Sequence, residues 1–354
     1  MRVALDATPL TLSSGGLSRY TCELSRALAQ EFPDDEFFLL SDQPFASPAC
    51  AVSNLKISGG PRHGIERRWW LWGVEREMSR RDVDVFHGTD FAVPYLARRP
   101  SVLTLHDLSP WMNPEWHHAA GRVRRRTPVL IGLHLASMVL TFSDAVRTQA
   151  IERFRIHPSR IATIPHAASE LFRPAPVKRS GNPYFLFVGT LEPRKNIPVL
   201  VEAWRNVRQK HAVDLMLVGR KRSDFCDPPA EDGLELVGEA PDEQLPGLYS
   251  GAAAVMYPSF YEGFGLPVLE AMQCGACVIT SRDAALGEVS GDAAVRVAAG
   301  DAAGLAQAMS AMLLQPERAA DLRQRALARA RLFSWSRTAR LTRELYEEAG
   351  RRFG

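Results

Sequence analysis

Two glutamates that flank a glycine-containing segment are the first residues of this sequence whose spacing suggests chemistry. Glu262 and Glu270 lie within the stretch PSFYEGFGLPVLE, at positions 258–270. An ionised carboxylate accepts hydrogen bonds from hydroxyl groups. The glycines between them, Gly263 and Gly265, allow backbone N–H groups to approach an anion closely. The stretch therefore suits a ligand that carries both phosphates and sugar hydroxyls, as a nucleotide sugar does.

The elements around these glutamates are predicted to present backbone N–H groups to the ligand. An apolar run at 252–257 indicates a buried strand, and Pro267 and Gly275 mark the ends of a helix over 267–274. The glycines then lie at the N-terminus of that helix, where unpaired N–H groups and the helix dipole favour a negative charge. Taken alone, the stretch leaves a second interpretation open, which is a glycine-rich loop with two surface glutamates.

The complete stretch resembles the signature of retaining glycosyltransferase family four, the group 1 glycosyltransferases, which have the GT-B fold. Seven residues separate its two glutamates, and Gly-Phe-Gly-Leu-Pro lies among them. Further stretches fit the same family in order and spacing, and they are Gly15-Gly16, His106-Asp107-Leu108 and Gly189 to Asn196. The resemblance covers nearly the whole chain. It implies an α/β protein whose two Rossmann-like doubly wound domains face each other across a cleft.

The resemblance also implies roles for individual residues. Glu262 and His106 are expected to orient the transferred sugar, and Glu270 to bind the ribose of the donor. Backbone contacts to donor or acceptor are expected at Gly15, Gly16, Gly189, Val237, Gly238, Gly263, Phe264, Gly265 and Leu266. The family mechanism in which the leaving phosphate takes the acceptor proton needs no protein nucleophile, so none is predicted.

Two adjacent basic residues are the expected partners of the donor diphosphate. Lys195 matches a lysine that the family places there, whereas Thr190 stands where many members have an arginine. Arg194 is the expected replacement for that arginine. Cations suit this position because the leaving nucleoside diphosphate gains negative charge as the glycosidic bond breaks. Asp82 and Asp84 spell a DxD motif, but they lie at the entry to a predicted strand, so they are not expected to bind a metal. The family resemblance implies that neither a metal nor another cofactor is needed.

Length and composition agree with a two-domain globular protein. A chain of 354 residues exceeds the usual single core, and 46% hydrophobic and 23% charged residues are ordinary values. A net charge of +3 is too small to indicate a nucleic-acid-binding face. Asp6 interrupts the first apolar run too early for a signal peptide, and no stretch reaches the roughly 20 apolar residues of a membrane span. We therefore expect a cytoplasmic location, with peripheral association at the inner face of the cell membrane left open.

The pattern of strands, helices and turn residues predicts where the domains begin and end. Residues 1–172 are the expected acceptor-binding domain, and 173–182 are a linker rich in proline and basic residues. Residues 183–335 are the expected nucleotide-sugar-binding domain. The last segment, 336–354, is a basic amphipathic helix that we expect to pack back on the first domain.

Two stretches of the first domain are candidates for contact with the acceptor or with lipid. Trp69–Trp72 follows basic residues in a helix expected at 66–80, and tryptophans at helical spacing favour a core role over a membrane role. Arg122–Arg126 is either a solvated face or a site for a phosphate, a carboxylate or anionic lipid. The sequence leaves these alternatives open.

These observations predict a retaining glycosyltransferase. The expected donor is a nucleotide sugar, GDP-linked in preference to UDP-linked, because Gly189 to Asn196 resembles bacterial mannosyl- and rhamnosyltransferases. The expected partners are this donor and a saccharide or lipid-linked acceptor in surface polysaccharide synthesis. The alternatives are a UDP-sugar-dependent transferase and a non-catalytic protein that binds sugar nucleotides.

Overall fold

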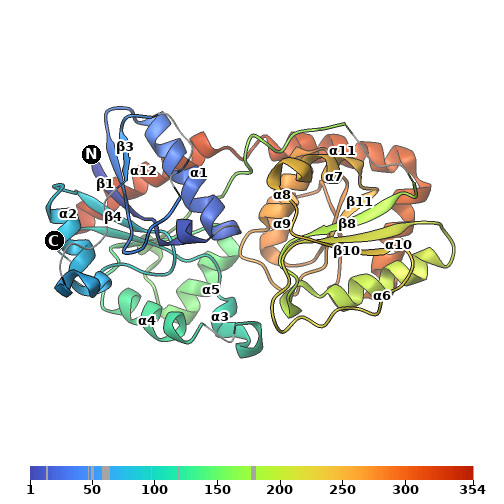
Figure 1. The fold of residues 1–354 in the computed structure, drawn as a ribbon, viewed down its shortest axis with the longest axis horizontal. Helices are drawn as coiled ribbons and strands as arrows, with labels where there is room; N and C mark the ends of the chain where they lie inside the picture. The colour runs from blue at the N-terminus through green and yellow to red at the C-terminus, as the bar shows by residue number, and fades with distance from the viewer. Residues whose placement is uncertain are drawn as a thin grey trace. The chain divides into compact units, whose positions relative to one another are not determined.

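The computed structural model describes residues 1–12, 15–46, 48, 52–57, 64–96, 98–117, 120–176 and 181–353. The chain forms two compact units (Figure 1). Unit 1 comprises Met1–His166 and Ser334–Gly354, and unit 2 comprises Ala167–Phe333. Within the described ranges, no helix has both the length and the apolar composition that crossing a membrane requires.

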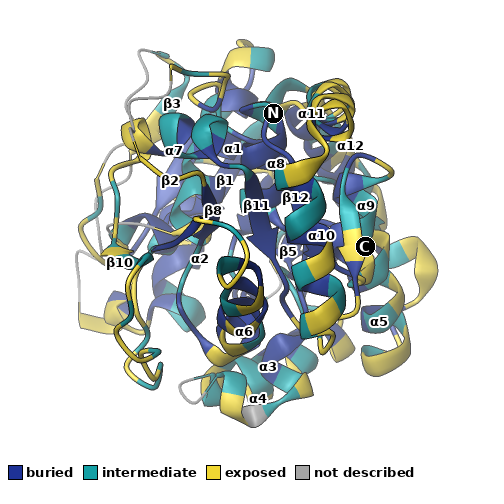
Figure 2. Ribbon diagram, turned by 90° about the vertical axis from the view of Figure 1, so that its right-hand side faces the viewer, coloured by how far each residue is buried: buried dark blue, intermediate teal, exposed yellow. Residues whose placement is uncertain are grey.

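Unit 1 is built on a parallel sheet with strand order β3-β2-β1-β4-β5-β6-β7. Parallel strands that are covered by helices are apolar on both faces, and the central strands of this sheet are buried (Figure 2). The strands are β1 (Arg2–Asp6), β2 (Glu36–Leu40), β3 (Leu55–Ile57), β4 (Val85–Gly88), β5 (Ser101–Thr104), β6 (Met138–Thr141) and β7 (Ile161–Thr163). The helices are α1 (Gly16–Glu31), α2 (Val74–Ser79), α3 (Ser109–Met112), α4 (Gly121–Gly132), α5 (Asp144–Phe154) and α12 (Trp335–Arg352).

The segment expected to form one helix at 66–80 is only partly α-helical in the structure. A 3-10 turn spans Gly64–Arg67, a π-helical turn spans Trp69–Gly73, and only Val74–Ser79 is α-helical. The turns pack tightly, because a Cβ atom on Gly73 would lie 2.2 Å from the carbonyl oxygen of Glu66. Trp69 is buried in the core, as favoured from its spacing.

Unit 2 repeats the same design with six parallel strands in the order β10-β9-β8-β11-β12-β13. The strands are β8 (Tyr184–Val188), β9 (Asp214–Val218), β10 (Leu234–Gly238), β11 (Ala254–Tyr257), β12 (Val278–Ser281) and β13 (Val295–Val297). The helices are α6 (Ile197–Arg208), α7 (Leu245–Gly251), α8 (Leu266–Gln273), α9 (Ala284–Ser290), α10 (Ala302–Leu314) and α11 (Pro316–Ala330). Helix α8 begins one residue earlier than the predicted Pro267, and Gly275 follows it with a left-handed φ of 72°.

The chain passes between the units at two places, between His166 and Ala167 and between Phe333 and Ser334. Residues 167–172 belong to unit 2, where Phe172 is buried with its ring 6.0 Å from that of Tyr249. The stretch expected as a linker, 173–182, also falls within unit 2, and its residues 177–180 lie outside the described residues.

Helix α12 belongs to unit 1 although it is the last element of the chain. It packs along α1, and Tyr346 forms a hydrogen bond of 2.7 Å with Nδ1 of His87 on β4. The other ring nitrogen of His87 lies 2.8 Å from the hydroxyl of Thr104 on β5. Burial lowers the pKa of His87 to about 3, so its ring is neutral and these hydrogen bonds hold it. The final helix is therefore joined to the centre of the first sheet.

Candidate functional site

The loops after β8 and β11 meet because these strands are neighbours at the point where the strand order of unit 2 reverses. Ligands of doubly wound sheets bind at such a point, outside the carboxyl ends of the strands. The N–H of Phe260 donates to the carbonyl of Arg194 at 3.0 Å, and Asn196 Nδ2 donates to the carbonyl of Pro258 at 3.1 Å. These hydrogen bonds fix Arg194 and Lys195 beside Glu262.

Glu262 accepts hydrogen bonds from both predicted cations. Lys195 Nζ lies 2.7 Å from Oε1 of Glu262, and Arg194 Nη1 lies 2.9 Å from Oε2. All three residues are buried. Burial by itself raises the pKa of Glu262, but the charges of Arg194 and Lys195 outweigh it and hold that pKa at about 2. The carboxylate is therefore ionised throughout the neutral range.

Lys195 is oriented by a second hydrogen bond, from Nζ to the hydroxyl of Tyr257 at 2.8 Å. Burial lowers the pKa of Lys195, and the nearby Glu262 opposes this effect. Burial and the charge of Glu262 raise the pKa of Tyr257 well above its usual value. Tyr257 is thus a neutral phenol that positions an ammonium group.

Arg194 is shared between two carboxylates. Its Nη2 lies 2.7 Å from Oε1 of Glu192, in addition to the contact with Glu262. Arg222 reaches the other oxygen of Glu192 at 3.2 Å and is itself paired with Asp224. The cluster therefore extends outward as a chain of alternating charges.

The N-terminus of α8 lies beside this cluster and is shaped by Gly265. That residue has a left-handed φ of 100°, and a Cβ atom there would lie 2.4 Å from Cδ2 of Leu286. The N–H of Glu262 donates to Oδ2 of Asp283 at 3.3 Å, and Asp283 also caps α9 through the N–H of Leu286. Burial raises the pKa of Asp283. The loop from Glu262 to Gly265 is thus anchored on both helices.

Glu270 lies inside α8 and is only 1% exposed. Its Oε2 accepts a hydrogen bond of 3.0 Å from the hydroxyl of Tyr249 on α7. The charge of Glu270 also contributes to the raised pKa of Tyr257. The hydrogen bond of Glu270 thus ties α8 to α7, whereas those of Glu262 hold Lys195 and Arg194.

Glycines lie at the carboxyl ends of β8 and of the two strands beyond it, β9 and β10. The N–H of Gly189 donates to the carbonyl of Val218 at 2.9 Å, and that of Gly219 donates to the carbonyl of Gly238 at 2.7 Å. A Cβ atom on Gly219 would lie 2.0 Å from the carbonyl oxygen of Gly189, so this close approach requires glycine. Val237 is 43% exposed beside Gly238. The predicted backbone contacts at these positions remain predictions.

The predicted site residues of unit 1 gather around the loops after β1, β4 and β5. His106 Nε2 donates to the carbonyl of Thr89 at 2.7 Å, and its ring packs edge-on against that of Tyr20. Burial lowers the pKa of His106, while Asp90 opposes this, so the imidazole is neutral and Nδ1 is left as an acceptor. Gly15 caps α1 with a φ of 113°, and a Cβ atom on Gly15 or Gly16 would meet no atom within 4 Å.

The comparisons with known proteins agree with this architecture. The profile of Glycosyltransferase Family 4 matches residues 14–169, and that of Glycosyl transferases group 1 matches residues 168–329. O-antigen chain mannosyltransferase B of Escherichia coli is 32% identical to this chain, over 98% of the chain and the whole of that protein. The chain belongs to the group 1 glycosyltransferases.

Other similar proteins extend this result to the fold. The serotype-specific mannosyltransferase WbdA of Escherichia coli is 28% identical over 69% of this glycosyltransferase, which covers 33% of WbdA. The sucrose-phosphate synthase of Thermosynechococcus elongatus superimposes with a TM-score of 0.77 and 22% identity over 98% of both chains. The glycosyltransferase has the GT-B fold, as predicted.

Several residues of the cluster were not found from the sequence. Glu192 lies two positions before Arg194 in the same motif, so its carboxylate was a visible signal that the pattern did not use. Tyr257 ends a strand and was counted only as part of an apolar run. Asp283 and Tyr249 come from more distant elements, and their contacts arise only when the chain folds.

Proposed function

We propose that this glycosyltransferase transfers a hexose of the mannose or rhamnose type, with retention of configuration, from a GDP-linked donor. The acceptor is a saccharide or a lipid-linked saccharide in the synthesis of a surface polysaccharide such as O-antigen, capsule or exopolysaccharide. The observation that carries the proposal is the buried cluster of Lys195, Arg194 and Glu262 at the N-terminus of α8. The similarity to an O-antigen chain mannosyltransferase over 98% of the chain supports the sugar and the pathway type.

The cluster suits a diphosphate that leaves. An ammonium group has three N–H donors, and within the described part of the chain two of them reach Tyr257 and Glu262. The third can donate to a phosphate oxygen. The N–H groups at the start of α8 add positive potential on the same side. Together they stabilise the charge that grows on the diphosphate in the transition state.

Glu262 and His106 orient the transferred sugar in the proposed reaction. Glu262 is ionised, so it accepts hydrogen bonds from hydroxyl groups of the sugar, and Glu270 accepts them from the ribose. The bond between the anomeric carbon and the phosphate oxygen breaks, and its electron pair stays on the phosphate. The acceptor hydroxyl attacks the same face of the sugar and gives its proton to the leaving phosphate oxygen. No protein nucleophile, metal or other cofactor takes part in this proposed step.

The first experiment is calorimetric titration of the protein with GDP and with UDP, each with and without magnesium. Micromolar binding of GDP that magnesium leaves unchanged is expected. Transfer from radiolabelled GDP-mannose and GDP-rhamnose to a membrane extract then tests the sugar. Binding of UDP alone overturns the proposed donor, and binding of neither nucleotide contradicts the proposed donor site itself. The distribution of the protein between cytosol and membrane fractions tests the expected cytoplasmic location and the alternative of peripheral association with the inner membrane face.

A further inference from the structure

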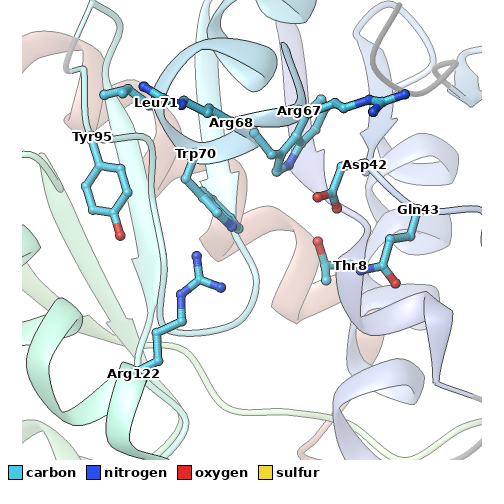
Figure 3. Close-up of a pocket in the computed structure, with 10 residues that line it drawn as sticks. Thr8, Asp42, Gln43, Arg67, Arg68, Trp70, Leu71, Tyr95 and Arg122 are labelled. Carbon is cyan, nitrogen blue, oxygen red and sulfur yellow. The ribbon is translucent and has the colours of Figure 1, made fainter. Parts of the chain in front are cut away.

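A pocket of about 470 Å³ lies within unit 1, at the carboxyl ends of β1, β2 and β4 (Figure 3). Thr8 follows β1, Asp42 and Gln43 follow β2, and Tyr95 follows β4. The other walls come from the turns at 67–71 and from Arg122 in the first turn of α4. Its size falls in the range of roughly 300–1,000 Å³ that encloses small ligands.

One side of the pocket is an aromatic surface held in place by the fold. The N–H of Tyr95 donates to the carbonyl of Trp70 at 2.9 Å, and the Trp70 ring packs edge-on against Phe86 on β4. The guanidinium carbon of Arg126 lies 5.3 Å from the centre of the Trp70 ring. Figure 3 shows the Trp70 ring directed into the pocket. A fixed aromatic ring of this kind offers a flat apolar face to the C–H groups of a sugar.

Hydrogen-bonding groups face this ring. Figure 3 shows the carboxylate of Asp42 and the hydroxyl of Thr8 on the side opposite Trp70, with the amide of Gln43 beside them. A carboxylate accepts hydrogen bonds from hydroxyl groups, and an amide both donates and accepts. An aromatic face opposite such groups matches a sugar ring, which is apolar on its faces and polar at its rim.

The charge of the pocket is positive. Arg67, Arg68 and Arg122 contribute to its lining, against the single carboxylate of Asp42. Figure 3 shows the guanidinium of Arg122 beside Trp70. Close to that ring, Nε of Arg126 is buried with no hydrogen-bond partner in the described structure. Arginine is suited to phosphate and carboxylate because its planar guanidinium donates two parallel hydrogen bonds.

The pocket is also linked by hydrogen bonds to the buried Asp6 at the end of β1. The hydroxyl and N–H of Thr8 both donate to Oδ1 of Asp6, at 2.6 and 3.0 Å. Asp6 interacts electrostatically with Asp90 and Arg126, and Asp90 interacts with His106. The pocket and His106 lie at the same edge of the unit 1 sheet, because both follow the carboxyl ends of its parallel strands.

We propose that this pocket binds an acceptor sugar that carries a phosphate or a carboxylate group. The ring stacks on Trp70, its hydroxyls bind Asp42 and Gln43, and its anionic group binds Arg122 and Arg68. The inference rests on the proposed function and deepens it by naming the chemical class of the acceptor. It also assigns an anion-binding role to Arg122. The sequence alone left two interpretations of Arg122–Arg126 open, a solvated face and a site for an anion.

The test uses saturation-transfer NMR and calorimetry with defined sugars. The probes are mannose 1-phosphate, glucuronic acid and methyl mannoside, which share a hexose ring and differ in charge, together with inorganic phosphate. The two anionic sugars are expected to bind at least about tenfold more tightly than methyl mannoside, since a hydrogen bond to a charged group contributes roughly 1.5–3 kcal/mol. Tighter binding of mannose 1-phosphate indicates that the pocket takes a phosphate, and tighter binding of glucuronic acid indicates a carboxylate. The proposal is overturned if inorganic phosphate binds as tightly as the two anionic sugars. It is also overturned if methyl mannoside binds as tightly as they do.

Variants locate the binding. Arg122→Gln is the decisive change because Arg122 is exposed and its removal spares the core. We expect it to reduce the affinity for the anionic sugars about tenfold and to leave methyl mannoside unchanged. Trp70→Leu is expected to weaken all three sugars. Arg125→Gln, on the same helix and outside the pocket lining, is the matched control and should bind like the original protein. If Arg122→Gln binds the anionic sugars as tightly as the original protein does, the proposal is wrong. It is also wrong if Lys195→Ala removes the binding of mannose 1-phosphate and the pocket variants do not.

Titration of the same preparations with GDP separates this inference from the proposed function. If GDP binds and the anionic sugars do not, the pocket assignment fails while the donor assignment stands. If the sugars bind with the expected dependence on Arg122 and GDP does not bind, the donor assignment fails and the pocket remains an anionic-sugar site.

Discussion

Lys195 is in contact with the two groups that define its chemistry, the carboxylate of Glu262 and the phenol of Tyr257. Both hold its ammonium group at the N-terminal side of α8 without neutralising it by proton transfer, because the pKa of Glu262 is about 2.

Replacement of Lys195 by alanine is expected to abolish donor binding. Loss of a charged hydrogen-bond donor to a diphosphate reduces affinity by at least roughly tenfold to hundredfold. Glu270→Ala is expected to have the same effect through the ribose. Calorimetry with GDP measures both, and Lys210→Ala, which removes an exposed lysine at the end of α6, is the control. Normal turnover in Lys195→Ala or Glu270→Ala would contradict the site assignment.

The affinity for GDP is expected to fall on the alkaline side at a lower pH than an ordinary lysine allows. Burial lowers the pKa of Lys195, so its positive charge is lost as the pH rises through that lowered value, below the usual 10.5. Titrations between about pH 7 and about pH 10 measure this. Lys195→Arg keeps its charge over this range, so its affinity, although weaker, should stay constant. A profile that is equally flat in both proteins would show that the ammonium charge does not matter.

His106→Ala is expected to spare donor binding and to remove transfer. The imidazole is neutral and fixed by its hydrogen bond to Thr89, and it belongs to unit 1, whereas Lys195, Glu262 and Glu270 belong to unit 2. Calorimetry with GDP and a transfer assay with the labelled donor test the two parts separately. His211→Ala, at the end of α6, is the control. Loss of GDP binding together with transfer would assign His106 a purely structural role.

At the scale of elements, the entry into α8 depends on the backbone of Gly265. Gly265→Ala is expected to destabilise unit 2 by about 1–3 kcal/mol, because a left-handed φ is strained for alanine and its Cβ meets Leu286. Chemical denaturation measures the stability, and GDP titration should show weaker binding because the N–H groups at the start of α8 move. Gly300→Ala is the control, since a Cβ there meets nothing within 4 Å and its φ needs no glycine. Equal stability of the two variants would exclude strain at Gly265.

The sequence predicted α8 to within one residue because proline and glycine mark its ends by their own backbone preferences. It did not predict the broken helix before α2, since the π-helical turn at Trp69–Gly73 depends on tight packing against Glu66. Likewise, Arg194, Lys195 and Glu262 could be named from motifs, but their meeting depends on β8 and β11 being neighbours. The contribution of Glu192 and Asp283 required that same tertiary arrangement.

At the scale of the whole molecule, α12 connects the end of the chain to the centre of the first sheet. Tyr346→Phe removes the hydroxyl that bonds to Nδ1 of buried His87, and the unpaired nitrogen is expected to cost about 1–3 kcal/mol. Hydrogen–deuterium exchange should increase in peptides from β4 and β5 and remain unchanged in those from unit 2. Tyr95→Phe, which alters a partly exposed tyrosine of the same unit, is the control. Faster exchange in both units, or in neither, would contradict this role of Tyr346.

The return of α12 to unit 1 determines how this protein can be recombined with its relatives. Unit 2 is one continuous segment, so a chimaera that takes unit 2, with its proposed donor site, from another transferase needs two joints, near 166 and near 333. A single crossover in the first of these places would bring a foreign terminal helix against His87 and α1. Such a hybrid would lose matched side chains at the centre of unit 1 even if its donor site were intact, so two-joint chimaeras should be recovered as folded proteins more often than one-joint chimaeras.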